Sequence, residues 1–252
     1  MGADDELMHR AGLLRAGELT PAPPRPAATV ALLRDSPAGP EVYLLRRVPK
    51  MAFAPGMYVF PGGSVDPADA DGTHAWAGQW AGLLGTDEVS AVALVRAAVR
   101  ETFEEAGVLL ASSTGSIVVP EIERADLEAR RITLTTLLDR HGLVLRPGLL
   151  APLQHWITPE LEPRRYDTWF FAAALPPGQE AREAGSEADD RVWATPAAAL
   201  GSGMRLMPPT RAALTELARY ATVAEVLAAE REIATVLPRF EVIGERLVRI
   251  DH

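Results

Sequence analysis

The 252-residue chain has no cysteine, no long apolar run and no excess of positive charge. Without cysteine it has no disulfide, thiolate nucleophile or sulfur-ligated zinc site, which fits a reducing compartment. No stretch approaches the roughly 18 uninterrupted apolar residues of a membrane span, and the start, MGADDELMHR, lacks the apolar core of a signal peptide. The formal net charge of -9 disfavours a nucleic-acid backbone as a partner. We therefore expect a cytoplasmic protein that binds neither nucleic acid nor membranes.

The composition is that of a globular protein with one sizeable core. Hydrophobic residues make up 48% of the chain and charged residues 23%. The segment TPAPPRPAAT (20–29) holds four prolines, which favour an extended arm over a helix. We divide the chain into an N-terminal arm (1–27), a main α/β domain (28–207) and a C-terminal helical extension (208–252).

Local patterns predict both strands and helices. Runs rich in β-branched and aliphatic residues, bounded by turn signals, predict strands at TVALLRD, EVYLLRR, GMYVFPGG, LQHWITP and YDTWFFAAAL. The first two flank SPAGP and predict a hairpin. Helical periodicity is clear over 88–106. We also expect a helical piece within 70–85, a second helical stretch over 121–140 and one or two helices over 208–233. EAGSEADDRVW (183–193) is expected to be a polar loop.

The stretch VRETFEEAGVLL (99–110) places Glu101, Glu104 and Glu105 on one side of the predicted helix, opposite its apolar side. Like charges at this spacing destabilise a helix by roughly 0.2–0.5 kcal/mol per pair, and no lysine or arginine follows in the next turn. Such carboxylates suit a hard cation, Mg²⁺ or Mn²⁺, whose bound water can become a nucleophile. A solvated acidic helix face is the alternative interpretation.

Gly63, Asp69 and RETFEEAGV (100–108) resemble the Nudix box, G-x5-E-x7-R-E-U-x-E-E-x-G-U, in which U is a bulky aliphatic residue. Asp69 stands where the family has its first glutamate, and Thr102 stands in an aliphatic position. Between Asp69 and Arg100 lie 30 residues where the family has seven, so the box contains a long insertion.

The insertion, about residues 70–87, makes the chain similar to one branch of the Nudix family. That branch includes the mammalian peroxisomal coenzyme A diphosphatase and its bacterial relatives. The resemblance covers most of residues 28–235. It implies the Nudix α/β/α sandwich, with a mixed sheet, an inserted loop and a C-terminal helical lobe over the site. Homodimers are common in the family, although no residue of this chain demonstrates a homodimer.

The resemblance also implies roles for the residues of the box helix. Glu101 and Glu105 would be the main ligands of Mg²⁺ or Mn²⁺, and Glu104 would be a further ligand within the catalytic set. Arg100 would fix a glutamate carboxylate through its guanidinium fork, the alternative being a surface arginine.

Nudix enzymes often carry one more carboxylate, a metal ligand or a base, in a loop before a tryptophan-bearing strand. Here Glu187 precedes Trp193 by six residues and is our choice for this catalytic role. Asp189 and Asp190 are its rivals, and a merely solvated acidic loop is the alternative.

Five residues are expected to bind the substrate: Gly62, Gly63, Arg47, Arg164 and Arg165. The two glycines lack a Cβ and so permit a close approach of the backbone to a ligand. The two consecutive arginines stand just before a strand, where guanidinium groups suit phosphate oxygens, with structural ion pairing as the alternative. Arg47 is in register with a motif of coenzyme A Nudix enzymes, although Ala52 stands where that motif has a second arginine.

Aromatic residues are scarce in this chain, at 6%, yet the insertion carries two tryptophans. We expect some of Trp76, Trp80 and Leu83 to cover the part of the substrate that lies beyond the diphosphate. The alternative is that they pack the insertion onto the core.

These features together predict a metal-dependent hydrolase that acts on the diphosphate of a nucleoside diphosphate derivative. The first-choice substrate is coenzyme A or an acyl form of it, which would give phosphopantetheine and 3',5'-ADP. Hydrolysis of ADP-ribose or a dinucleotide is one alternative. The other is a non-catalytic nucleotide sensor with the same fold, against which the retention of all three glutamates argues.

Overall fold

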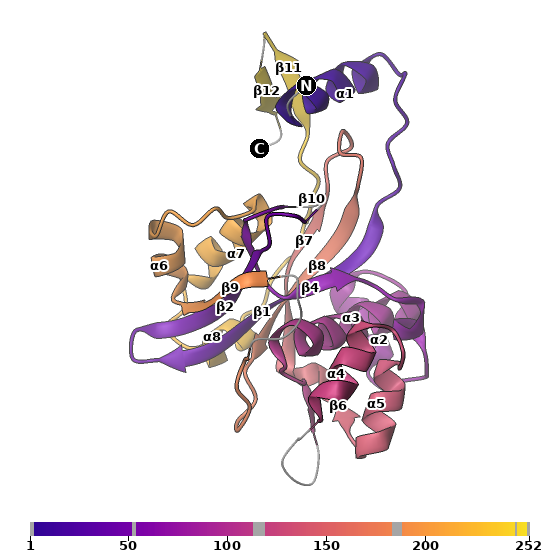
Figure 1. The fold of residues 1–252 in the computed structure, drawn as a ribbon, viewed down its shortest axis with the longest axis vertical. Coiled ribbons are helices and arrows are strands. Elements are labelled where there is room, and N and C mark those ends of the chain that lie inside the picture. Colours follow the sequence, from indigo (N-terminus) through magenta and orange to yellow (C-terminus); the bar gives the residue numbers. More distant parts are fainter. Residues whose placement is uncertain (1–2, 52–53, 113–118, 183–187, 245, 251–252) are drawn as a thin grey trace.

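The computed structural model describes residues 3–51, 54–112, 119–182, 188–244 and 246–250. The strands of its main sheet are β1 (Arg25–Ser36), β2 (Gly39–Arg47), β3 (Tyr58–Val59), β4 (Gly62–Ser64), β7 (Leu150–Ile157), β8 (Tyr166–Ala174), β9 (Ala188–Ala194) and β10 (Thr235–Val236). They form one sheet in the order β10-β7-β8-β1-β2-β3, with β4 paired to β1 and β9 paired to β2 (Figure 1). Since β1 and β8 are parallel while β1 and β2 are antiparallel, the sheet is mixed, as expected.

The two central strands are buried on both faces, so they consist of nearly continuous apolar residues. On β1, Val30 and Leu32 point into one core, whereas Ala31 and Leu33 point into the other. This alternation follows from the two-residue period of a strand. The sheet therefore needs a helical layer on each face.

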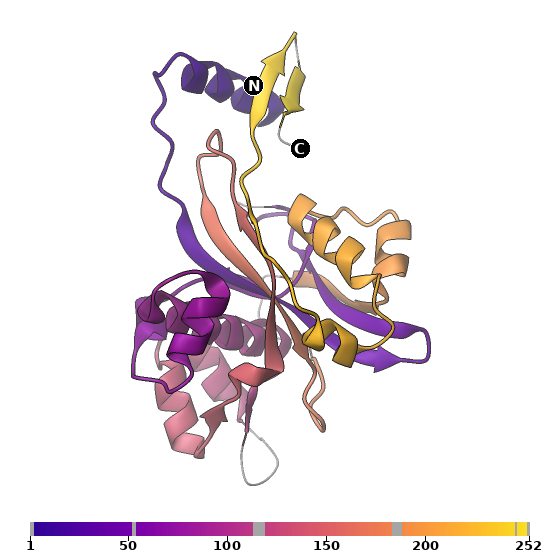
Figure 2. The same cartoon turned by 180° about the vertical axis from the view of Figure 1, so that it is seen from behind.

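Helices supply both layers. The first layer consists of the short 3-10 helix η1 (Pro67–Ala70) and helices α2 (Ala77–Leu84), α3 (Glu88–Ala106), α4 (Glu121–Glu128) and α5 (Leu134–His141). The second consists of α6 (Pro196–Gly201), α7 (Pro208–Leu217) and α8 (Val223–Ala228) (Figures 1 and 2). The short strands β5 (Ala111–Ser112) and β6 (Val144–Leu145) pair beside the first layer, and the 3-10 helix η2 (Pro147–Leu149) precedes β7. The expected α/β/α sandwich is confirmed.

The two ends of the chain meet at one end of the molecule. Helix α1 (Ala3–Arg15) contacts the hairpin formed by β11 (Phe240–Ile243) and β12 (Arg246–Arg249). Both lie beyond the turn between β7 and β8, and Arg10 Nε donates to the carbonyl oxygen of Leu161 in that turn at 2.6 Å (Figure 2). We call α1 and the β11–β12 hairpin the terminal cap.

Several local predictions are confirmed, and others need correction. The hairpin of the first two strands is present, and the helix expected over 88–106 has these bounds. The stretch 121–140 is two helices, α4 and α5, because the chain turns at Arg130, which has a φ of 59°. The described part of the expected polar loop is strand β9, paired with β2, and the C-terminal extension ends in strands after α8. No helix in the described ranges has the length and apolarity that crossing a membrane requires.

Candidate active site

Helix α3 carries the acidic residues and is buried along most of its length. Asp87 caps its start by accepting a hydrogen bond from the Ser90 amide, and Gly107, with a φ of 67°, ends it in the left-handed conformation. Glu101 and Glu104 are only 6% and 4% exposed. A solvated acidic face is therefore the wrong interpretation, because buried carboxylates require compensating partners.

Arg100 is one such partner, itself only 2% exposed. Its Nη2 donates to Asp69 Oδ2 at 2.8 Å and to the Ser64 carbonyl oxygen at 2.9 Å, and its Nε also contacts the Asp69 carboxylate. Its Nη1 lies 2.5 Å from Glu101 Oε1 and 3.3 Å from Glu104 Oε1. Arg100 thus ties helix α3 to η1 and β4, and it holds the two glutamates beside each other.

Asp69 is held for this contact by its own turn. The Asp66 amide donates to Asp69 Oδ2 at 2.8 Å, and Asp66 in turn accepts a hydrogen bond from the Ala68 amide, which is the reciprocal arrangement of a capping box. Asp69 is therefore a buried support for Arg100. This contact brings together the two halves of the box across the long insertion.

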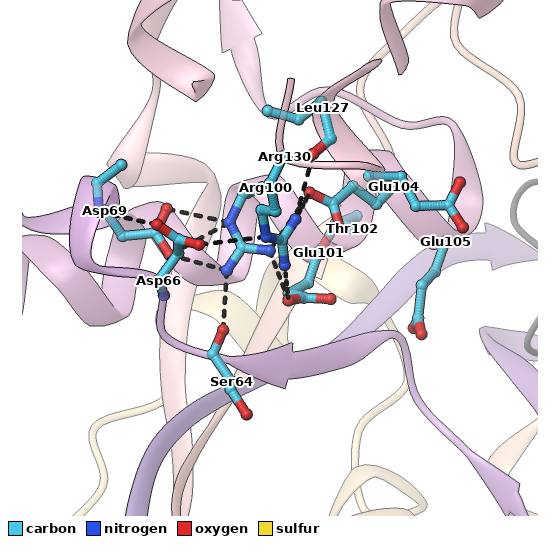
Figure 3. A network of polar contacts seen from close by, with 12 residues as sticks. Ser64, Asp66, Asp69, Arg100, Glu101, Thr102, Glu104, Glu105, Leu127 and Arg130 are labelled. Carbon is cyan, nitrogen blue, oxygen red and sulfur yellow. Dashed lines mark hydrogen bonds and ion pairs between the residues drawn. The ribbon is translucent and has the colours of Figure 1, made fainter. Parts of the chain in front are cut away.

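Arg130 is a second cationic partner and comes from the segment between α4 and α5. Its Nη1 lies 2.6 Å from Glu104 Oε1, its Nη2 lies 3.7 Å from Glu101 Oε1 and its Nε lies 3.2 Å from Asp66 Oδ2. Figure 3 shows Arg100 and Arg130 between the two aspartates on one side and the glutamates on the other. Four carboxylates therefore face two guanidinium groups.

Glu105 takes a different direction and contacts the glycine turn. Its Oε2 accepts a hydrogen bond from the Gly62 amide at 2.8 Å. A Cβ on Gly63 would lie 2.6 Å from the carboxyl carbon of Glu101, and a Cβ on Gly62 would lie 2.5 Å from Thr29 Oγ1. Close approach of the turn to helix α3 and β1 therefore explains both glycines.

Burial changes the proton affinity of this cluster. It raises the pKa of Glu101 to about 7, with Arg100 acting in the opposite direction and the Glu104 charge adding to the rise. Burial likewise raises the pKa of Glu104 against the effect of both arginines. For Arg100, burial alone would lower the pKa, but the hydrogen bond to Asp69 and the surrounding carboxylates raise it instead. Added positive charge would favour the ionised glutamates.

All three glutamates line a cavity of about 880 Å³. Arg130 also lines it, as do four of the residues expected to bind substrate: Arg47, Gly62, Gly63 and Arg164. The far end of the cavity is lined by the terminal cap and the β7–β8 hairpin, with Leu7, Trp156, Leu161, Phe240, Leu247 and Arg249. The cavity thus runs from the acidic helix toward the chain ends.

For Arg165, which was expected to bind substrate, the structure favours a structural role instead. Its Nε donates to the Thr158 carbonyl oxygen at 3.0 Å and its Nη1 to the Ala22 carbonyl oxygen at 2.8 Å, and its side chain is buried. Arg165 is absent from the described cavity lining, in contrast to its exposed neighbour Arg164. Arg165 therefore ties the N-terminal arm to the β7–β8 turn.

Of the three candidates for the loop carboxylate, the structure describes only the two aspartates. Glu187 lies outside the described residues, as does Ala52, while Ala188 next to Glu187 lines the cavity. Asp189 pairs with Arg46 at 2.7 Å, and Asp190 accepts a hydrogen bond from the Tyr58 hydroxyl at 2.5 Å. Neither rival aspartate is among the cavity-lining residues that the structure describes.

For the insertion, the structure favours the packing alternative over the expected contact with the substrate. Residues 70–87 are described throughout, and none of them lines the cavity. Trp80 is buried against Phe171, with ring centroids 5.9 Å apart, and Trp76 stacks on His74 and packs against the same core. Leu83 is 51% exposed. The insertion forms α2 and extends the hydrophobic core.

The donor chemistry of the site fits a divalent cation, since Glu101, Glu104 and Glu105 offer carboxylate oxygens to one cavity. Their present orientations do not converge: across the residues whose positions are described, no three acidic or histidine side chains form a metal-binding group. The reason is that two of the glutamates face arginines and the third faces the Gly62 amide. A bound cation would therefore replace at least one of these contacts.

Sequence reasoning missed Arg130 and the terminal cap. Arg130 lies outside the box, and no local pattern marks an arginine that adopts a positive φ. Phe240 and Leu247 stand in a segment assigned to a helical extension, although their hairpin sequence, FEVIGERLVR, alternates around a glycine and could have been identified by that signal.

Comparison with known proteins supports the resemblance to Nudix hydrolases. No family model matches the chain. It is 28% identical to the acyl-coenzyme A diphosphatase NUDT19 of Gallus gallus, in an alignment that spans 75% of this chain and 64% of the relative's own length. A crystal structure of a NUDIX hydrolase from Alicyclobacillus acidocaldarius superposes with a TM-score of 0.69 at 28% identity, covering 82% of this chain and 97% of that one.

Proposed function

Because the chain belongs to the Nudix hydrolase family, we propose that it hydrolyses the diphosphate bond of a nucleoside diphosphate derivative with the aid of Mg²⁺ or Mn²⁺. Coenzyme A or an acyl-coenzyme A is the proposed substrate, with phosphopantetheine, or its acyl form, and 3',5'-ADP as products. The observation that carries this proposal is the set of three glutamates that line one cavity, two of them buried and held by Arg100.

Each residue has a distinct part in the proposal. Glu101, Glu104 and Glu105 supply the carboxylates that would hold the cation. When bound, the cation supplies positive charge for the diphosphate and makes a water molecule more acidic. Arg100, which does not line the described cavity, positions Glu101 and Glu104 from behind. The general base remains Glu187 in this proposal.

The cavity walls favour an elongated substrate. Arg47 and Arg164 line the cavity and suit phosphate oxygens. The terminal cap adds an apolar wall, formed by Leu7, Phe240 and Leu247, at the far end. A diphosphate that carries a long and mainly uncharged arm, such as acylated pantetheine, matches a cavity that has arginines along its wall and an apolar far end. The name of the chicken relative agrees with this substrate class.

ADP-ribose or a dinucleotide is the second candidate, and a non-catalytic nucleotide sensor is the third. A sensor has no need for carboxylates that bind a catalytic cation, so the intact set of glutamates disfavours it. The proposed catalytic domain is residues 28–207, with the terminal segments completing the cavity.

A panel of substrates tests the proposal. Coenzyme A, an acyl-coenzyme A, ADP-ribose and a dinucleotide are incubated with the full chain and Mg²⁺, Mn²⁺ or a chelator, and the products are separated by chromatography. We expect metal-dependent release of 3',5'-ADP from the two coenzyme A compounds, with kcat/KM at least about tenfold above that for ADP-ribose. Preferential hydrolysis of ADP-ribose or the dinucleotide would support the second candidate, and binding without hydrolysis would support the sensor.

A further inference from the structure

Arg130 occupies a backbone position that glycine usually fills. Helix α4 ends with the Arg130 amide bonded to the Leu127 carbonyl oxygen at 2.9 Å and the Arg131 amide bonded to the Asp126 carbonyl oxygen at 2.8 Å. This is the Schellman arrangement, in which the residue after the cap adopts a positive φ and is most often glycine. Arg130 adopts a φ of 59° there.

The same chain uses glycine at comparable helix ends. Helices α2, α3 and α5 end at Gly85, Gly107 and Gly142, all in the left-handed conformation. Arginine is unusual in this conformation, and such outliers concentrate at functional sites. The side chain of Arg130 is therefore a better explanation of its presence than the backbone is.

That side chain and a divalent cation require the same atoms. Glu104 Oε1 accepts from Arg130 Nη1 at 2.6 Å, and Glu101 Oε1 lies 3.7 Å from Arg130 Nη2. These carboxylates belong to the proposed cation site. A guanidinium that binds a carboxylate oxygen competes with a metal ion for it, by occupying lone pairs and by charge repulsion.

The two arginines of the cluster differ in how easily they can leave it. Arg100 is buried, and three of its donors are fixed on Asp69 and the Ser64 carbonyl oxygen. The Arg130 side chain is 44% exposed and lines the 880 Å³ cavity. A cation that enters from the cavity would therefore displace Arg130 and leave Arg100 in place.

We propose that Arg130 competes with the divalent cation for Glu101 and Glu104 and, once displaced, donates to the substrate diphosphate in the same cavity. Cation binding then frees Arg130 for the diphosphate, and a diphosphate that holds Arg130 frees the glutamates for the cation, so each binding event favours the other. The first half of this proposal concerns metal binding alone, and only the second half rests on the proposed function.

Arg130→Gly tests the first half, because glycine removes the guanidinium and suits the φ of this position. Mn²⁺ is titrated into the full chain without substrate, and free Mn²⁺ is followed by electron paramagnetic resonance. We expect Arg130→Gly to bind Mn²⁺ about tenfold more tightly than the unmodified chain, or about 1.4 kcal/mol. Arg131→Ala is the matched control, since Arg131 pairs with Asp126 on the surface, and it should leave Mn²⁺ affinity unchanged.

Unchanged or weaker Mn²⁺ binding by Arg130→Gly would overturn the competition, because a purely supporting arginine would organise the glutamates for the metal. Circular dichroism checks the fold, and Arg130→Asn, which also tolerates a positive φ, repeats the test independently.

The second half is tested at saturating Mn²⁺. There Arg130→Gly should raise KM about fivefold for coenzyme A and for ADP-ribose alike, with a smaller change in kcat, since the diphosphate is common to both. Unchanged KM values would overturn the transfer of Arg130 to the substrate. If the unmodified chain hydrolyses neither compound, the proposed function fails, while the Mn²⁺ titration still decides the competition.

Discussion

The insertion and the terminal cap are two additions to the same sandwich, and they lie in opposite relations to the site. The insertion, 70–87, interrupts the Nudix box itself and carries tryptophans, yet it packs into the core through Trp80. The terminal cap comes from the two most remote parts of the sequence, and its Leu7 and Phe240 line the cavity. Nearness to a motif along the chain therefore does not decide which segment lines the cavity; the path of the backbone around the sheet does.

The largest effect is expected for Trp80→Ala in the insertion. Trp80 is buried and packs edge-on against Phe171, so its loss should lower the free energy of unfolding by about 3–5 kcal/mol. Urea denaturation measures this change. At temperatures where the variant is folded, its KM for coenzyme A should equal that of the unmodified chain. A raised KM in the folded variant would show that the insertion contributes to substrate binding, contrary to the difference from the terminal cap described above.

Glu105→Gln gives the reference value for damage to the site itself. Glutamine keeps the hydrogen bond from the Gly62 amide but removes a ligand charge, so kcat should fall at least about a hundredfold, or about 2.7 kcal/mol. Steady-state kinetics at several Mn²⁺ concentrations measure it. Glu88→Gln, an exposed change in the first turn of the same helix, is the control and should retain full activity. Near-normal turnover with unchanged metal dependence in Glu105→Gln would contradict the proposed metal site.

Phe240→Ala tests whether the terminal cap contributes to substrate binding. Phe240 is half-buried at the far end of the cavity, so its truncation should raise KM for an acyl-coenzyme A about fivefold, or about 1 kcal/mol, with kcat unchanged. Ile243→Ala on the same strand, which is exposed and outside the described lining, should have no effect. Equal KM values for the two variants would show that the cap does not contact the substrate.

The smallest effect is expected for Leu83→Ser, also in the insertion. Its side chain is 51% exposed, and such surface changes usually alter the free energy of unfolding by less than about 0.5 kcal/mol. KM for coenzyme A and for ADP-ribose should both stay unchanged. A selective rise in KM for coenzyme A would again place the insertion at the substrate.

What could be predicted from the sequence was local. The bounds of α3 follow from its periodicity, its capping residue Asp87 and its terminal Gly107. The convergence of Glu101 and Glu104 in one cavity follows from their three-residue spacing, which places them on one side of a helix. The Nudix box resemblance supplied the fold class, because its motif fixes the order of strand, turn and helix.

What could not be predicted depends on contacts between distant residues. Arg164 and Arg165 are neighbours with identical chemistry, and only the partners Thr158 and Ala22 decide that the second is structural. Strand β9 is too polar to be recognised by its composition. It forms because it pairs with β2, a contact that the local sequence does not encode. The position of Arg130 depends on how α4 packs against α3, which no local pattern encodes.

The parallel pairing of β1 with β8 has a consequence for the order in which the chain folds. Arg25 pairs with Tyr166 and Leu33 with Ala174, so the central strand of the sheet acquires one of its neighbours only after most of the chain has been synthesised. Until then β1 has an open edge of unpaired amides and carbonyls beside a nearly continuous apolar run. Such non-local pairing slows folding and exposes a surface prone to aggregation. Fragments that end before residue 166 should therefore aggregate even though they contain the entire Nudix box.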